Sequence, residues 1–190
     1  MKSNEYETLF AKLHVYKNET PKRTHPRLKQ YNYSSNGAYF ITVCVNGKRE
    51  MLGKITVGRD DLGTPNFELS EYGVIARKYI DSIESHYKDV SIDKYVVMPN
   101  HIHLIIIINK DVLFSPADSA PESSRPTALI PAIISALKKL TNREFGFNMW
   151  QSSYYDRIIR NEEEYLKIWQ YIDNNPARWA EDEYYSQGQD

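Results

Sequence analysis

The segment His101-Ile102-His103 holds the residues of this chain whose types and spacing most directly suggest chemistry. It opens the apolar run 104–108, which is typical of a buried β-strand. Residues two apart in a strand project from the same face, so both imidazoles can reach one cation. Two histidines at a strand end can also be packed or solvent-facing, so the pair alone leaves a metal site and a structural role open.

The residues before the histidines indicate how they are positioned. Segment 95–98 is predicted to be a strand, and Pro99-Asn100 is a turn signal between it and the histidine strand. Two adjacent apolar strands joined by a short turn suit a sheet that helices cover on at least one side. We therefore expect the histidines near the end of a strand.

A tyrosine on the last predicted helix is a second candidate. Asn161 and Glu164 form a capping-box pattern that starts this helix. Its apolar stripe should face the sheet and consists of Tyr165, Ile168, Trp169 and Ile172. Tyr171 lies off that stripe, on one flank with Lys167 and Asn175. From the helix alone, a solvent-facing Tyr171 beside the terminating Asn175-Pro176 is the favoured interpretation.

Composition is consistent with one globular domain, because 190 residues with 41% hydrophobic content can bury a sizeable core. The lone Cys44 cannot form an intramolecular disulfide and is expected to be a small buried residue. The polar N-terminus and the absence of a long apolar run predict a soluble, cytoplasmic protein with no membrane association. The net charge is −1, yet basic residues dominate segment 12–59, so a locally basic surface is expected.

The remaining pattern predicts an α+β protein. Strands are expected over 39–45 and from the Asn46-Gly47 turn to about residue 58, and a helix over 70–87 that Ser70 caps. A further helix is expected over 127–143, ended by Gly146, after a linker rich in Ser, Pro and Ala. This order suggests an antiparallel sheet with helices packed on one face, a class that includes ferredoxin-like (RRM-like) folds.

Three motifs in this order resemble the REP-associated tyrosine transposases of the single-tyrosine HUH superfamily. They are the Met98-to-His103 segment, the Trp150-Gln151 region with Tyr155 and 157–161, and Tyr171-Ile172 with 174–176. The resemblance runs from about residue 27 to 179. It implies one HUH transposase-like catalytic domain over 37–179. Composition predicts a basic N-terminal arm over 1–36, a surface linker at 109–126 that has no clear counterpart in the family, and an acidic tail over 180–190.

The resemblance implies a ferredoxin-like fold and metal-dependent cleavage and joining of single-stranded DNA beside hairpins, through a 5'-phosphotyrosine link. It assigns Tyr171 as the nucleophile on a C-terminal helix, and His101, His103 and Asn175 as metal ligands. Ligand chemistry alone allows zinc or manganese, whereas the family implies Mg²⁺ or Mn²⁺. Relatives are monomers, or homodimers that exchange the tyrosine helix.

The DNA contacts are expected among basic and aromatic side chains, namely Arg27, Lys29, Tyr31, Lys138, Lys139, Arg157, Arg160 and Lys167. Exposed charges without a ligand are an equal alternative for each of the helical cations. Two other functions stay open. An RRM-like module would bind nucleic acid without cutting it. A histidine-triad nucleotide hydrolase would need a third histidine where this chain has Ile105.

Overall fold

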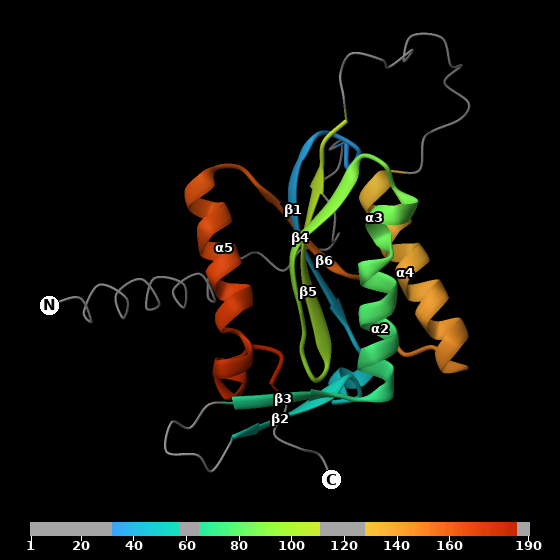
Figure 1. Ribbon diagram of the computed structural model, residues 1–190, viewed down its shortest axis with the longest axis vertical. Helices are drawn as coiled ribbons and strands as arrows, with labels where there is room; N and C mark the ends of the chain where they lie inside the picture. Colours follow the sequence, from blue (N-terminus) through green and yellow to red (C-terminus); the bar gives the residue numbers. More distant parts are fainter. Residues whose placement is uncertain (1–31, 58–64, 111–127, 186–190) are drawn as a thin grey trace, which may run out of the picture.

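The computed structural model describes residues 32–57, 65–110 and 128–185 (Figure 1). Most of the expected arm and linker, including Arg27, Lys29 and Tyr31, lies outside these residues. The strands are β1 (Gly37–Cys44), β2 (Gly53–Val57), β3 (Pro65–Leu69), β4 (Val90–Val97), β5 (His101–Ile108) and β6 (Tyr155–Ile159). The α-helices are α2 (Glu71–Asp81), α3 (Ile83–His86), α4 (Leu129–Phe145) and α5 (Glu162–Asn174), and short 3₁₀ turns cover Asn46–Lys48 and Pro176–Glu181.

The main sheet is antiparallel, with strand order β4-β5-β1-β6. The chain enters it in the order β1, α2, β4, β5, α4, β6, which is the βαββαβ arrangement of a ferredoxin-like fold. The predicted α+β class is therefore confirmed. Strands β2 and β3 form a separate hairpin between β1 and α2, at the lower end of the molecule in Figure 1.

Helices cover both faces of the sheet, which differs from the expected packing on one face. Helices α2 and α4 lie on one side and α5 lies on the other (Figure 1). The cause is the aliphatic run in β5. Leu104 and Ile106 belong to the large core beneath α2 and α4, whereas Ile105 belongs to a smaller core with Ile168 and Ile172 of α5. A strand that is apolar on both faces requires a cover on each.

Two strands were absent from the expected order of elements, and their sequences show why. In β6, Asp156 and Arg157 interrupt the apolar pattern. Among the described strands it lies at the edge of the sheet and pairs with β1 alone, and polar side chains are tolerated at such an edge. Strand β3 begins with Pro65, which is typical of a loop but is tolerated at the first residue of a strand.

The predicted helix over 70–87 is present as two helices. Ser70 caps α2 as expected, since its side chain accepts a hydrogen bond from the Gly73 N–H at 3.2 Å. The break falls at Ser82, whose hydroxyl donates to the Tyr79 carbonyl at 2.8 Å. A serine that bonds back to the preceding turn bends a helix.

In the described residues, none of the helices is long and apolar enough to cross a membrane.

The start of α2 packs directly onto backbone, and this gives a test of the fold. A Cβ atom at Gly73 would lie 2.0 Å from the Leu52 carbonyl oxygen. That oxygen cannot easily move, because it accepts from the Ser70 N–H while Leu52 N–H donates to the Pro99 carbonyl. We expect Gly73→Ala to lower the free energy of unfolding by about 2–3 kcal/mol in urea denaturation.

The matched control is Val74→Ala, one residue away on the exposed side of the same turn. It should change the free energy of unfolding by only about 0.5 kcal/mol. Equal stability of the two variants would contradict the close approach.

Candidate active site

The two histidines are held where β5 begins, directly after the β4–β5 turn. The turn is closed by the Met98 N–H, which donates to the His101 carbonyl at 2.8 Å. Both imidazoles are buried, and their Nε2 atoms lie 2.9 Å apart. The predicted arrangement, with both rings on one face of the strand and close enough to share a cation, is thus present.

The surroundings of His101 fix its neutral form. Its Nδ1 donates to the Oδ1 of Asn100 at 2.8 Å. The orientation of that amide follows from its Nδ2, which donates to the carbonyl oxygens of Lys48 and Tyr184 at 3.1 and 2.8 Å. A proton on Nδ1 leaves the Nε2 lone pair of His101 free to accept.

His103 lies between three polar partners, and these allow its ring proton to sit on either nitrogen. Its Nε2 faces His101 Nε2 and lies 3.2 Å from the Tyr171 hydroxyl oxygen, while its Nδ1 lies 2.9 Å from Thr42 Oγ1. Because His101 Nε2 accepts, neutral His103 donates from Nε2 and accepts from Thr42. A threonine hydroxyl can also accept, so the proton can move to Nδ1 and free the second Nε2 lone pair.

Burial keeps both rings uncharged. It lowers the pKa of His101 from 6.5 to about 3, with a smaller contribution from the nearby charge of Lys48. Burial also lowers the pKa of His103 well below its ordinary value, and His101 adds to this effect while Asp182 opposes it. Neutral imidazole is the form of histidine that binds metals.

Tyr171 reaches the histidines from α5, on the face of the sheet that this helix covers. Its ring contacts the rings of His103 and Phe40 at centroid distances of 5.2 and 6.2 Å. The hydroxyl donates to Asp182 Oδ2 at 3.2 Å. Burial, followed by the negative charges of Asp182 and Glu183, raises the pKa of Tyr171 above its ordinary value. The residue therefore faces the histidines and not bulk solvent, contrary to the interpretation favoured from the helix alone.

Asn175 lies one helical turn after Tyr171, at the end of α5. It is only 4% exposed, and its Nδ2 donates to Asp182 Oδ2 at 2.9 Å. Its Oδ1 is buried and has no hydrogen-bond partner within the described part of the chain. Buried amide oxygens are normally satisfied, so this atom is suited to a ligand that the chain itself does not provide.

Asp182 is a member of the site that the sequence analysis did not single out. The 3₁₀ turn Pro176–Glu181 brings the chain back toward the sheet, and ligand atoms of His101, His103 and Asp182 all lie within 4.8 Å of one another. The acidic segment that contains Asp182 suggested a solvated tail. The signal was the aromatic residue nearby, because Tyr184 packs on the His101 ring at a centroid distance of 4.6 Å.

Within the part of the chain that the structure describes, the predicted DNA-contacting cations are divided among α4, β6, the turn after β6, and α5. Lys167 pairs with Glu163, and Arg157 pairs with Glu164 at 2.5 Å. On α4, Lys138 donates to the Gln151 and Ser153 carbonyls and Lys139 is exposed. Arg160 is exposed beside the start of α5. Lys138 and Lys139 belong to α4, which lies on the sheet face opposite α5 (Figure 1).

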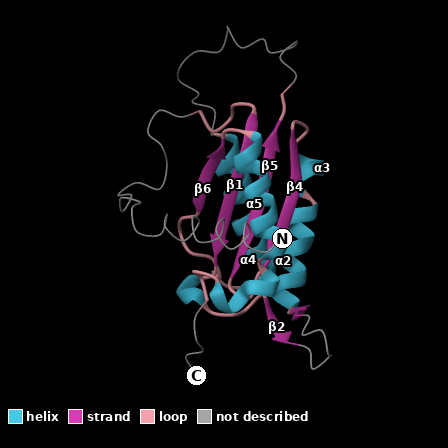
Figure 2. Cartoon of the chain, turned by 90° about the vertical axis from the view of Figure 1, so that its left-hand side faces the viewer, coloured by secondary structure: helices cyan, strands magenta, loops and turns pink. Residues whose placement is uncertain are grey.

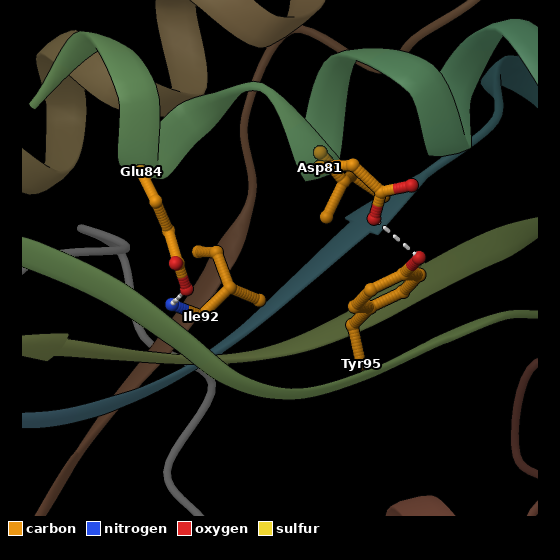
Figure 3. A pocket seen from close by; sticks show the side chains of 5 residues that line it. Asp81, Glu84, Ile92 and Tyr95 are labelled. Carbon is orange, nitrogen blue, oxygen red and sulfur yellow. Dashed lines mark hydrogen bonds between the residues drawn. The ribbon is translucent and has the colours of Figure 1, made fainter.

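Cys44 and a separate pocket show no comparable chemistry. Cys44 is buried as expected, and burial raises the pKa of its thiol to about 11. The pocket, of about 190 Å³, lies between α2, α3 and β4 (Figure 3). Its carboxylates are already bonded, since Tyr95 donates to Asp81 at 2.6 Å and the Ile92 N–H donates to Glu84 at 2.7 Å.

The fold and the site together define a ferredoxin-like α+β protein in which a His-x-His strand faces a helix tyrosine. No protein-family model matches the chain. An uncharacterized protein of Haemophilus influenzae is 35% identical over 173 residues, which cover 84% of this chain and 91% of that protein. The chain belongs to the same family as this protein.

A solved structure gives the likeness in three dimensions. It shows a REP-associated tyrosine transposase bound to a REP hairpin, and it matches this chain with a TM-score of 0.56 at 20% sequence identity. The match covers 82% of this chain and 74% of that chain. The resemblance to these transposases that the sequence motifs indicated is thus confirmed for the fold.

The buried histidines should make the metal-free protein sensitive to acid. The pKa of His101 is lowered on folding, so the unfolded chain takes up a proton near pH 6.5 while the folded chain does so only near about 3. The contribution of neutral His101 to the free energy of unfolding is therefore fully present above about pH 6.5 and is lost as the pH falls. Between pH 7 and pH 5 the free energy of unfolding should decrease by about 2 kcal/mol through His101 alone.

The measurement is urea denaturation with chelator present, at both pH values, of wild type and His101→Asn. The variant keeps an N–H donor for Asn100 but cannot titrate, so its loss between the two pH values should be about 2 kcal/mol smaller. An identical loss in both proteins would show that His101 is not buried in its neutral form.

Proposed function

We propose that this protein is a metal-dependent single-stranded DNA endonuclease and strand transferase, a transposase that acts beside DNA hairpins through a 5'-phosphotyrosine intermediate. The observation that carries the proposal is the 3.2 Å approach of the Tyr171 hydroxyl to His103 Nε2, inside a cluster with His101, Asn175 and Asp182. A nucleophile and a set of metal ligands are the two components that this reaction needs. The fold shared with a hairpin-bound tyrosine transposase supports the same conclusion.

The chain provides a ligand set that fits Mg²⁺ or Mn²⁺. We assign His101 Nε2, His103 Nε2 and Asn175 Oδ1 as ligands, and we add the Asp182 carboxylate. Two observations support this assignment: the 2.9 Å contact between the two Nε2 atoms, and the Asn175 Oδ1, which has no partner among the residues that the structure describes. Carboxylate and amide oxygens favour Mg²⁺ and Mn²⁺, whereas imidazoles accept several metals. A cation held there would polarise the scissile phosphate and offset the charge that develops on it.

Tyr171 would supply the nucleophile. Its hydroxyl oxygen attacks phosphorus and loses its proton, for which Asp182 Oδ2 is the hydrogen-bonded acceptor. The bond from phosphorus to the 3' oxygen breaks, that oxygen takes up a proton, and a 5'-phosphotyrosine and a free 3'-hydroxyl result. Because the phosphodiester is replaced by a phosphotyrosine ester, attack by another 3'-hydroxyl can reverse the step and join strands without ATP.

The arrangement of the site supports catalysis within one chain. Helix α5 packs against β4 and β5 of its own sheet and places Tyr171 on its own His103. A homodimer that exchanges this helix is not needed to complete the cluster. A function in DNA cleavage and joining also fits the cytoplasmic location expected from the sequence.

The alternative functions have weaker support. In a histidine-triad hydrolase, position 105 would carry the third histidine, but Ile105 is buried in the apolar core under α5. A purely binding RRM-like module would have the same fold, but it gives no reason for the partly buried Tyr171 to converge with the buried His101, His103 and Asn175.

The nucleophile can be tested with labelled single-stranded hairpins from the DNA that flanks the encoding gene. In Mn²⁺, wild type should form a covalent adduct that survives a denaturing gel. Tyr171→Phe should lower the rate by about 10⁴-fold or more, because the attacking oxygen is absent. Tyr165→Phe on the same helix is the control and should form adduct like wild type, since its hydroxyl bonds Asp93 away from the site. Adduct formation by Tyr171→Phe would refute the assignment.

The ligand set can be tested without any DNA. We expect Asn175→Ala and Asp182→Asn each to weaken Mn²⁺ binding by about 10-fold or more, measured by calorimetry or by the electron paramagnetic resonance signal of free Mn²⁺. Asp173→Asn is the control, because Asp173 is exposed and pairs with Lys94. Unchanged affinity in Asp182→Asn would remove Asp182 from the ligand set and leave the other ligands standing.

A further inference from the structure

The edge strand β6 presents an aromatic ring on the same sheet face as the histidines. Directly opposite residues of an antiparallel pair project to one face. His103 pairs with Thr42 on β1, and Thr42 pairs with Tyr155 on β6. The three side chains therefore form a row that leads from the candidate metal ligand to the edge of the sheet.

The distance along this row suits neighbouring nucleotides of one strand. Adjacent strands lie about 4.8 Å apart, so Tyr155 stands roughly 10 Å from His103. A second connection runs through Tyr184, whose ring lies 6.4 Å from Tyr155 and 4.6 Å from His101 between centroids. An unpaired base next to a phosphate at Tyr171 would fall within reach of the Tyr155 ring.

Tyr155 is also accessible. It is 59% exposed, the largest exposure among the large hydrophobic side chains of the described residues. Figure 2 looks onto the face that α5 covers and shows β6 at the edge of the sheet, next to β1. The helix packs against β4 and β5 on the other half of the sheet, so it leaves the Tyr155 end of β6 open.

A cation accompanies this ring on the same face. Arg157 follows two residues later on β6 and pairs with Phe40 of β1, so it projects to the same side as Tyr155. Its side chain is 66% exposed, and its Nε donates to Glu164 at 2.5 Å. The ion pair with Glu164 orients the guanidinium near the edge that carries the ring. Proteins that bind single-stranded nucleic acids combine an aromatic ring with a nearby cation, because bases stack on the ring and the cation binds the phosphates.

We infer that Tyr155 is the stacking platform for an unpaired base of the DNA strand that enters or leaves the catalytic centre, and that this strand runs along the edge of β6. The inference rests on the proposed function, because it takes the phosphate at Tyr171 as its origin. An unpaired base is required because a base inside a duplex does not offer its ring face. The ligand is therefore the single-stranded flank of the hairpin.

The test uses hairpin oligonucleotides in which each position of the single-stranded flank is replaced in turn by the fluorescent base 2-aminopurine. The proteins carry Tyr171→Phe to prevent cleavage and are compared with Tyr155 intact, Tyr155→Phe and Tyr155→Leu. We expect quenching at one or two neighbouring positions with Tyr or Phe at 155 and no quenching with Leu. The dissociation constant should rise by about 5- to 150-fold in Tyr155→Leu and stay near the parent value in Tyr155→Phe.

Two controls separate stacking from a change in the fold. Tyr79→Leu makes the same substitution on α2, whose tyrosine hydroxyl bonds Glu144 on the opposite side of the sheet, and it should bind like the parent. Tyr155→Thr also removes the ring but keeps a residue that favours strand structure, so it should lose quenching as Tyr155→Leu does. Mn²⁺ binding by every variant should equal that of the parent. Adduct formation by the protein with Tyr171 is measured in parallel.

The outcomes distinguish the two proposals. Quenching that depends on the ring at 155, without any adduct from wild type, supports the stacking platform and contradicts cleavage. Adduct formation by wild type, with equal quenching and affinity in Tyr155→Leu, overturns the stacking platform alone. A parent protein that binds none of the oligonucleotides overturns both.

Discussion

Two imidazoles that are buried without charge where β5 begins constrain the rest of the site. Burying them uncharged is possible only because each ring nitrogen has a polar neighbour, with Asn100 beside His101, Thr42 beside His103, and 2.9 Å between the two Nε2 atoms. Without these neighbours the desolvated nitrogens would destabilise the fold. The β4–β5 turn, the register of β1 on β5 and the buried amide of Asn100 are therefore fixed by the same requirement.

The second constraint comes from the aliphatic strand that follows the histidines. Ile105 projects from the face opposite Leu104 and Ile106, so the sheet needs a cover on each side. Helix α5 supplies that cover with Ile168 and Ile172. Once this stripe is docked, the helical repeat determines where its flank lies, so that Tyr171 meets His103 and Asn175 meets Asp182 of the same cluster. The packing of an ordinary apolar core thus aligns a hydroxyl and an amide with two imidazoles.

The parts of the site that could be predicted are those set by a local period. A two-residue period placed His101 and His103 on one face, and a helical period aligned Tyr171 with Asn175. The orientation of Tyr171 toward the site depends on which sheet face α5 covers, and the helix alone suggested solvent. The presence of strand β6 and the position of Asp182 depend on partners distant in sequence. Strand β6 is stabilised by pairing with β1, and Asp182 is positioned by contacts that form only after the chain turns at 176–181.

The same cluster shows where this fold accepts a cost in stability. Asp182 Oδ2 receives hydrogen bonds from both Tyr171 and Asn175, while Asn175 Oδ1 receives none within the described residues. An unsatisfied buried acceptor costs about 1–3 kcal/mol, and a chain selected only for stability would replace it with an apolar group. A group that binds the folded chain at this oxygen would recover that cost and stabilise the fold by mass action. The unpaired oxygen is therefore better explained by binding than by folding, and it lies where the imidazoles, the carboxylate and the tyrosine hydroxyl converge.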